Sequence, residues 1–318
     1  MELTMVNRGD FERFYAAELQ PVLAQTETTR KSVSAFRKTR NTGLIICVAA
    51  GLIIFVAGGG AALIVPALAA IALVWIYNSK KSAFAGEFKN IVIGRIIKFI
   101  NPDAVYEPQS YMPEHEYQAS SLYRKKYDNY NGEDFFSGKY DKTAFFCSEL
   151  HTSYETKDEK GHTHTHTIFD GLFFVADFNK YFNGETYVWQ DGFADDSFVG
   201  RLFSSFSSSK EQVDLEDPEF EAAFSVYSTD QVEARYILSP SLMQRLLQLK
   251  QKMNCPMSCS FVGSKMYMAF ETDLDLFEPG ISETNETLEA AWGYVLQFRL
   301  FFDIIDDLNL NVRIWTKG

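Results

Sequence analysis

The sequence lacks the local signatures of the common enzyme classes. It contains no G-x-S-x-G, no P-loop, no G-x-G-x-x-G and no H-E-x-x-H motif. Two isolated histidines, His115 and His151, have no nucleophile or acid partner visible in the sequence. We therefore identify no catalytic residue and expect no cofactor, which favours a binding or scaffold protein over an enzyme.

Cysteine is also scarce. The chain of 318 residues has four cysteines, Cys47, Cys147, Cys255 and Cys259. With the cytoplasmic topology argued below, so few thiols should stay reduced. The last two have a C-x₃-C spacing that occurs in zinc sites, but no second ligand pair with a suitable spacing stands nearby. We expect these two thiols to be structural.

A long segment lacks charge altogether, because no charged residue occurs between Arg40 and Lys80. As one helix at 1.5 Å per residue it would measure roughly 58 Å, about twice the hydrocarbon core of a bilayer. The triple glycine of residues 58–60 can reverse the chain, since glycine tolerates left-handed backbone angles. We predict a transmembrane hairpin of two short helices, residues 42–57 and 61–77.

Basic residues flank both ends of this run. Five Lys and Arg, and no acid, occur within residues 30–40, and Lys80 and Lys81 follow the run. Positive charge on both sides favours a cytoplasmic location for both termini. Each predicted helix has only about 16–17 residues, near the lower limit for crossing a bilayer, so a re-entrant or interfacial hairpin is the alternative.

The remainder of the chain is acidic. The whole sequence has 30 Lys and Arg against 42 Asp and Glu, a net charge of −12. Seven of these basic and five of these acidic residues precede residue 42, which leaves 23 basic and 37 acidic residues, or about −14, after the hairpin. Such a surface repels phosphate backbones, so we expect no nucleic-acid partner.

The periodicity of the apolar residues outside the hairpin predicts an α+β cytoplasmic domain. An N-terminal helix is expected to begin at an N-cap, Asp10. A Tyr-rich connector after Pro102 is expected to pack against a sheet rather than stack on bases. Residues 218–227 fit helix and strand equally well. The predicted helices are 84–100, 196–206, 285–308 and one that begins at Ser239; the predicted strands are 142–154, 164–178, 184–190, 257–262, 265–271 and 311–315.

These elements divide the chain into four parts. The parts are an N-terminal cytoplasmic helix with a basic juxtamembrane end (1–41), the transmembrane helical hairpin (42–78), a helix with the Tyr-rich connector (79–131), and the α+β cytoplasmic domain (132–318). The lipid bilayer is the expected partner of residues 42–78.

The sharpest local pattern is G-H-T-H-T-H-T, which contains His162, His164 and His166. On a strand these imidazoles would share one face, about 6–7 Å apart. They could bind nickel, zinc or copper, with Asp158 or Glu159 completing the shell. The alternative, favoured by the wide spacing, is the polar outer face of a hairpin.

Two further acidic groups have simpler explanations than catalysis. Asp303, Asp306 and Asp307 resemble paired carboxylates, but a solvated acidic helix face accounts for them. Asp170 and Asp177 adjoin an apolar strand, so we expect turn or cap residues there.

Five stretches, in this order, carry a resemblance to a known family: FYAAELQPVL, IIKFINP, YNGEDFFSGKYDKTAFFCSEL, FDGLFFVADFNKYFNG and ARYILSPSLMQRLLQLK. Over most of its length the chain resembles the bacterial domain-of-unknown-function family 3137, whose members are uncharacterised membrane proteins. The resemblance implies a bacterial envelope protein with a cytoplasmic α+β domain. Together with the predicted hairpin, it leads us to expect the bacterial inner membrane as its location. It supplies no activity and no site residues.

Three functions follow as hypotheses. The first is a membrane-anchored, non-enzymatic, cytoplasmic-facing binding or scaffold protein with an unknown protein or small-ligand partner. The second is a lipid-headgroup-binding domain, suggested by fold analogy from successive strands before a C-terminal helix that bears Trp292. The third is a metal-binding sensor that uses the His162, His164 and His166 strand.

Overall fold

The computed structural model divides into two compact units. Among the described residues, the helical unit contains 7–100 and 277–296, and the sheet unit contains 101–276 and 297–310. The predicted helix 196–206 and strand 311–315 lie outside the described residues. The structure describes residues 7–178, 180–190, 211–273, 275–308 and 310.

The helical unit begins with a helix that is interrupted once by a π-helical turn. α1 (Arg8–Phe14) leads through η1 (Tyr15–Leu19) into α2 (Gln20–Val56). The N-cap of α1 is Asn7, whose side-chain oxygen accepts the Asp10 N–H at 2.8 Å. The prediction of Asp10 as the cap was therefore wrong: Asp10 lies in the first turn, where its charge favours the helix N-terminus.

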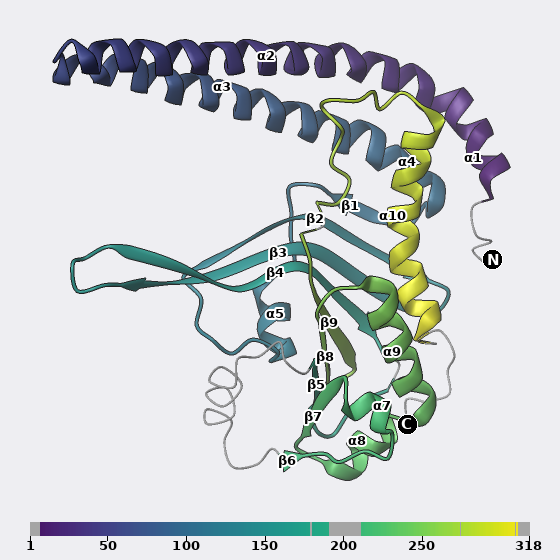
Figure 1. The fold of residues 1–318 in the computed structure, drawn as a ribbon. Coiled ribbons are helices and arrows are strands. Elements are labelled where there is room, and N and C mark those ends of the chain that lie inside the picture. The colour runs from purple at the N-terminus through teal and green to yellow at the C-terminus, as the bar shows by residue number, and fades with distance from the viewer. Residues whose placement is uncertain (1–6, 179, 191–210, 274, 309, 311–318) are drawn as a thin grey trace. The chain divides into compact units, whose positions relative to one another are not determined.

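The predicted reversal at the triple glycine is confirmed. α2 ends at Val56, Gly58 adopts φ +75°, and a short 3₁₀ helix, η2 (Gly60–Leu63), leads into α3 (Ile64–Phe88). A residue with a Cβ would be strained at this φ, which explains the glycine. α2 and α3 then run side by side in opposite directions (Figure 1).

The helix after the hairpin is a continuation of α3 and not a separate element. α3 passes through a second π-helical turn, η3 (Lys89–Ile93), into α4 (Gly94–Ile100). The segments Arg8–Val56 and Gly60–Ile100 are long and apolar enough, by length and composition alone, to cross a membrane.

Residues 277–296 belong to the helical unit and pack on the parts of α2 and α3 outside the uncharged segment. Arg30 forms an ion pair with Glu27 at 2.6 Å and donates to the Ile281 carbonyl at 2.8 Å. Lys89, also buried, pairs with Glu278 at 2.8 Å. α10 (Leu288–Asp307) contributes residues to both units.

The sheet unit is built on one sheet in which every pair of neighbouring strands is antiparallel. Within the described residues the strand order is β1-β2-β3-β4-β9-β8-β5-β7-β6 (Figure 1). The strands are β1 (Val105–Glu107), β2 (Asn129–Tyr140), β3 (Thr143–Lys157), β4 (Thr163–Asp177), β5 (Thr186–Gln190), β6 (Glu211–Gln212), β7 (Phe224–Ser228), β8 (Met257–Val262) and β9 (Lys265–Glu271). The helices are α5 (Glu114–Ser120), α7 (Pro218–Glu221), α8 (Gln231–Ile237) and α9 (Pro240–Met253).

The mixed helix-and-sheet class predicted from the sequence is confirmed, although the long strand β2 was not predicted. The predicted strands correspond to β3, β4, β5, β8 and β9, and the helix capped by Ser239 is α9. The ambiguous residues 218–227 form both a helix, α7, and a strand, β7. β2 was missed because its sequence, NYNGEDFFSGKY, is rich in residues that disfavour strands.

Both faces of the sheet are covered. Tyr117 of α5 packs against Phe173 of β4 with ring centroids 5.4 Å apart, and Leu150 lies in the same cluster. The Tyr-rich connector therefore packs on the sheet, as predicted. On the other face Phe298 of α10 contacts Phe136 of β2, with ring centroids 5.4 Å apart.

Candidate functional site

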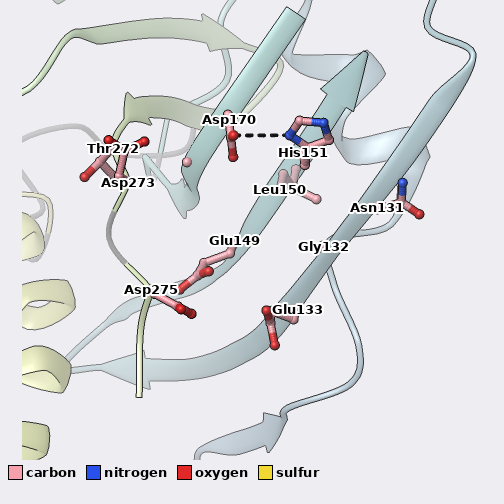
Figure 2. A pocket seen from close by; sticks show the side chains of 11 residues that line it. Asn131, Gly132, Glu133, Glu149, Leu150, His151, Asp170, Thr272, Asp273 and Asp275 are labelled. Carbon is pink, nitrogen blue, oxygen red and sulfur yellow. Dashed lines mark ion pairs between the residues drawn. The ribbon is translucent and has the colours of Figure 1, made fainter. Parts of the chain in front are cut away.

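A pocket of about 490 Å³ opens over β2, β3 and β4 and the segment that follows β9 (Figure 2). Five carboxylates line it, from three strands and one loop, together with a single imidazole. These side chains are Glu133, Glu149, Asp170, Asp273, Asp275 and His151.

Two glycines allow the strands to approach closely at this pocket. A Cβ on Gly132 would lie 2.2 Å from the Glu149 carbonyl oxygen. A Cβ on Gly171 would lie 2.1 Å from the Phe270 carbonyl oxygen, and Gly171 has φ +147°. Because both clashes involve backbone atoms, no side chain larger than hydrogen fits either position without moving a strand.

A bulge in β2 shapes one side of the same site. The register between β2 and β3 shifts between Glu133 and Phe136, and Asp134 adopts φ +57° inside this bulge. The buried Asp134 carboxylate accepts a hydrogen bond from the Tyr106 hydroxyl. Bulges of this kind redirect side chains locally, here at the position of Glu133.

Three carboxylates converge at one end of the pocket. Glu133 and Glu149 are directly opposite each other on β2 and β3, and one oxygen from each lies within 4.8 Å of an Asp275 oxygen and of the other. Figure 2 shows the three side chains gathered there. Glu149 accepts a hydrogen bond from the Leu276 N–H. Burial, reinforced by the neighbouring carboxylates, raises the pKa of Glu149 to about 8.

A histidine and an aspartate face each other at the other end of the pocket. His151 Nδ1 lies 3.2 Å from Asp170 Oδ2, and the two residues are cross-strand partners on β3 and β4. Asp170 therefore lies inside a strand, and the prediction of a turn or cap residue was wrong. His151 also has an acid partner, which the sequence did not reveal because 18 other residues separate the two.

The chemistry of this pocket favours cations over anions. Oxygen ligands at the spacing of Glu133, Glu149 and Asp275 are the kind that hard divalent ions accept, and these are the residues of the described chain placed closely enough to hold one. A phosphate or carboxylate ligand would meet like charge on most sides.

The structure separates the three histidines of the predicted metal site. His162 and His164 both face Asp158, with ring nitrogens 3.0 and 3.6 Å from Asp158 Oδ2. His166 instead stacks on Tyr154, with ring centroids 4.9 Å apart, and lies outside that group.

The acidic residues near the end of α10 have partners on other elements. Lys252 forms ion pairs with Asp303 and Asp307 at 3.0 and 2.9 Å, and the Tyr140 hydroxyl donates to Asp306 at 2.7 Å. These carboxylates therefore connect α10 to its neighbours, while Asp303 and Asp307 stay 26% and 38% exposed to solvent.

The cysteines behave as structural residues where their surroundings are described. Cys147 and Cys259 are fully buried in β3 and β8, and Cys255 is half-buried. Burial raises the pKa of the Cys259 thiol, which makes it a poor nucleophile and a poor metal ligand at neutral pH.

Sequence reasoning missed the acidic pocket. Its carboxylates come from β2, which was not predicted, from β3 and β4, and from the loop after β9, and no local spacing connects them. The one sequence signal was the pair of glycines, Gly132 and Gly171, which stand inside otherwise strand-forming stretches and indicate a bulge or a close backbone approach.

Comparison with known proteins supports the predicted family resemblance. The family described as "Protein of unknown function (DUF3137)" matches residues 167–310, so the chain resembles this family over that segment. Two of the stretches quoted above, FDGLFFVADFNKYFNG and ARYILSPSLMQRLLQLK, lie within it. No protein with a curated description matches the chain.

One solved structure shows a low level of similarity to this chain. It is the crystal structure of the mycobacterial trehalose monomycolate transport factor A, TtfA, with 13% sequence identity and a TM-score of 0.34. The match covers 68% of this chain and 96% of that one.

Proposed function

We propose that this protein is a membrane-anchored, non-enzymatic binding or scaffold protein whose sheet unit faces the bacterial cytoplasm. The observation that carries the proposal is the outward-facing apolar surface of the α2–α3 hairpin. Ile53 and Val65, one on each helix, leave 71% of their surface exposed. Hydrocarbon is the solvent in which such a surface is stable, because the driving force that buries apolar groups in water is absent there.

The charges that flank the uncharged run lie at one end of the hairpin only, which supports anchoring with that end at the membrane surface. The first charged residues on either side of the uncharged run, Arg40 on α2 and Lys80 on α3, lie at the same end of the antiparallel pair. Arg40 lies over the Tyr77 ring at 4.0 Å, which joins the two helices at this level. With basic residues on both helices at this end, the positive-inside rule favours the cytoplasmic face of the inner membrane for both termini.

The acidic pocket indicates which ligands the sheet unit would accept. Four carboxylates besides the protonated Glu149 surround this opening, and they favour a cationic group and repel an anionic one. This argues against anionic lipid headgroups as ligands of that pocket. A protein partner or a small cationic ligand fits the proposed binding role better.

Topology can be tested with reporter fusions placed at the triple glycine of residues 58–60 and after Gly318. The proposal expects a reporter that is active only in the cytoplasm to be active after Gly318. A reporter active only in the periplasm should report at the glycines if the hairpin spans fully, and at neither site if it is re-entrant. A periplasmic C-terminus would contradict the proposal.

The scaffold role is tested by crosslinking in native membranes followed by purification of the full chain. A recurrent partner at near-stoichiometric amounts supports the proposal. Turnover of a substrate by the purified full chain would contradict the non-enzymatic part.

A further inference from the structure

Basic side chains gather on the α2–α3 hairpin beside the uncharged run. No acidic residue occurs between Glu27 and Glu87. Of the seven basic residues in that interval, Arg30 and Lys31 both pair with Glu27, at 2.6 and 3.8 Å. The other five form no ion pair with any residue that the structure describes; they are Arg37, Lys38, Arg40, Lys80 and Lys81.

Two of these cations lie over aromatic rings of the opposite helix. Arg40 Cζ, on α2, is 4.0 Å from the centroid of the Tyr77 ring on α3. Lys80 Nζ, on α3, is 5.7 Å from the centroid of the Phe36 ring on α2. In each helix the ring and the cation are three or four residues apart, about one turn. The two contacts therefore lie at neighbouring levels of the antiparallel pair, and each helix contributes one cation.

Both cations keep hydrogen-bond donors for a ligand. Arg40 donates from Nε and Nη2 to the side-chain oxygen of Asn41, at 3.1 and 2.7 Å. Within the described part of the chain, its third nitrogen, Nη1, donates to no protein acceptor, and neither does Lys80 Nζ. Positively charged donors of this kind bind phosphate oxygens through short, charge-assisted hydrogen bonds.

Trp75 marks the depth of these cations in a membrane. It leaves 70% of its surface exposed and lies five residues before Lys80 on α3, about 7.5 Å along the helix axis. Tryptophan prefers the interface between hydrocarbon and headgroups. In the anchored protein, Lys80 and Arg40 therefore lie at the level of the lipid phosphates.

We propose that Arg40 and Lys80, supported by Lys38 and Lys81, bind the headgroup of an anionic phospholipid at the cytoplasmic face of the membrane. This inference rests on the proposed function, because the cations reach lipid phosphates when the hairpin is anchored in a bilayer. A zwitterionic headgroup carries a cation of its own, which these side chains repel. The site therefore discriminates by the net charge of the headgroup.

The acidic remainder of the chain keeps this attraction local. The part after the hairpin carries about −14 and is repelled by an anionic leaflet. Attraction between basic residues and such a leaflet falls off within a Debye length, about 8–10 Å. The lipid preference therefore belongs to the basic end of the hairpin and not to the protein surface as a whole.

The test uses the full chain in vesicles of phosphatidylcholine and phosphatidylglycerol, with brominated acyl chains on one lipid or the other. Bromine quenches tryptophan fluorescence at short range, and Trp75 is the one tryptophan inside the uncharged run. The ratio of quenching by the two brominated lipids gives their relative association constant beside Trp75. We expect phosphatidylglycerol to be preferred at least about fivefold, which corresponds to about 1 kcal/mol.

Four variants separate a built site from general charge. Arg40→Gln/Lys80→Gln should lower the preference to less than about twofold, because both ring-bound cations are lost. Tyr77→Leu should lower it without changing the charge, since Arg40 then has no ring beneath it, whereas Tyr77→Phe should keep it. Arg95→Gln/Lys98→Gln is the matched control, because these residues lie at least 15 residues beyond Lys80, about 22 Å along the chain of helices. It should leave the preference unchanged.

The proposal is overturned by equal quenching from the two brominated lipids in the wild-type chain. It is also overturned if the control variant loses as much preference as Arg40→Gln/Lys80→Gln, or if Tyr77→Leu loses none, because the effect is then one of diffuse charge. Loss of the preference in excess soluble glycerol phosphate would assign the site to free phosphate. Carbonate extraction from pure phosphatidylcholine vesicles tests anchoring separately: release contradicts the proposed function, whereas retention without lipid preference contradicts this inference alone.

Discussion

At the scale of single residues, Glu149 lies in surroundings that disfavour its charged form. It lies opposite another glutamate, Glu133, and like charges in directly opposed strand positions are destabilising. Asp275 adds a third carboxylate within 4.8 Å. Burial and these neighbours favour the protonated form of Glu149, whose pKa is about 8.

This pKa makes stability depend on pH in a definite direction. The reference pKa of the side chain is 4.5, so between pH 4.5 and about 8 the folded chain holds a proton that the unfolded chain has lost. The stabilisation from protonated Glu149 is complete below pH 4.5 and disappears as the pH rises to about 8. Its contribution to the free energy of unfolding should fall by at most about 1.4 kcal/mol per pH unit over this range.

Replacing Glu149 by Gln should remove this pH dependence. The amide oxygen can still accept the Leu276 N–H, while the titrating group is gone. The difference in unfolding free energy between wild type and Glu149→Gln, measured by denaturant titration from about pH 5 to about pH 8.5, should shift steadily in favour of the variant as the pH rises. The exposed Glu155→Gln serves as the control. A constant difference across the range would contradict the assignment.

At the scale of elements, the pairing of β4 with its neighbouring strands requires their backbones to approach closely at Gly171. β4 pairs with β3 on one side and β9 on the other, and Gly171 lies opposite Leu150 of β3 and Glu271 of β9. Its φ of +147° is a conformation that residues with a Cβ rarely adopt. The glycine is therefore needed twice, for its backbone angle and for the space beside Phe270.

Gly171→Ala should destabilise the protein by at least about 2 kcal/mol, because the strain at this φ costs about 1–3 kcal/mol and a clash with backbone adds to it. A lowered melting temperature of the full chain in detergent measures the effect. Gly293→Ala is the matched control: Gly293 lies on the α10 helix and has nothing within 4 Å of a new Cβ. That substitution should be neutral or stabilising by up to about 1 kcal/mol. Equal melting temperatures for the two variants would contradict this account.

At the scale of the whole molecule, an uncharged hairpin is joined to a strongly acidic remainder. The net charge of −12 would give a protein good solubility, whereas residues 42–78 would oppose it. Anchoring in a bilayer resolves the conflict, since the apolar segment enters hydrocarbon and the acidic remainder stays in water. This division underlies the proposed function.

Charge placed in the hairpin should weaken membrane association. Ile53 and Leu68 are 71% and 60% exposed on α2 and α3, and a lysine near the bilayer centre costs about 2.5–3.5 kcal/mol in insertion measurements. The double variant Ile53→Lys/Leu68→Lys should move from the carbonate-resistant membrane pellet to the supernatant or to aggregates. Thr39→Lys, at an exposed position outside the uncharged run, should stay in the pellet. Release of the wild-type chain by carbonate would contradict anchoring altogether.

The sequence alone predicted the features of the fold that depend on residues close together in the chain. The uncharged run and its triple glycine predicted the α2–α3 reversal, and a Ser-Pro start predicted α9. Strand-forming apolar stretches bounded by turn residues predicted β3, β4, β8 and β9. The class of the fold followed, because period and turn chemistry depend on residues within a few positions of one another.

Only the tertiary structure decided which polar groups meet. β2 pairs because β3 offers it partners, in spite of its poor strand composition, and its bulge then places Glu133 beside Glu149 and Asp275. The loop at the hairpin tip likewise turned Asp158 toward two histidines and left the third on Tyr154. Sites are formed by contacts between residues far apart in the chain or by the detailed course of a turn, and neither is encoded in spacing alone.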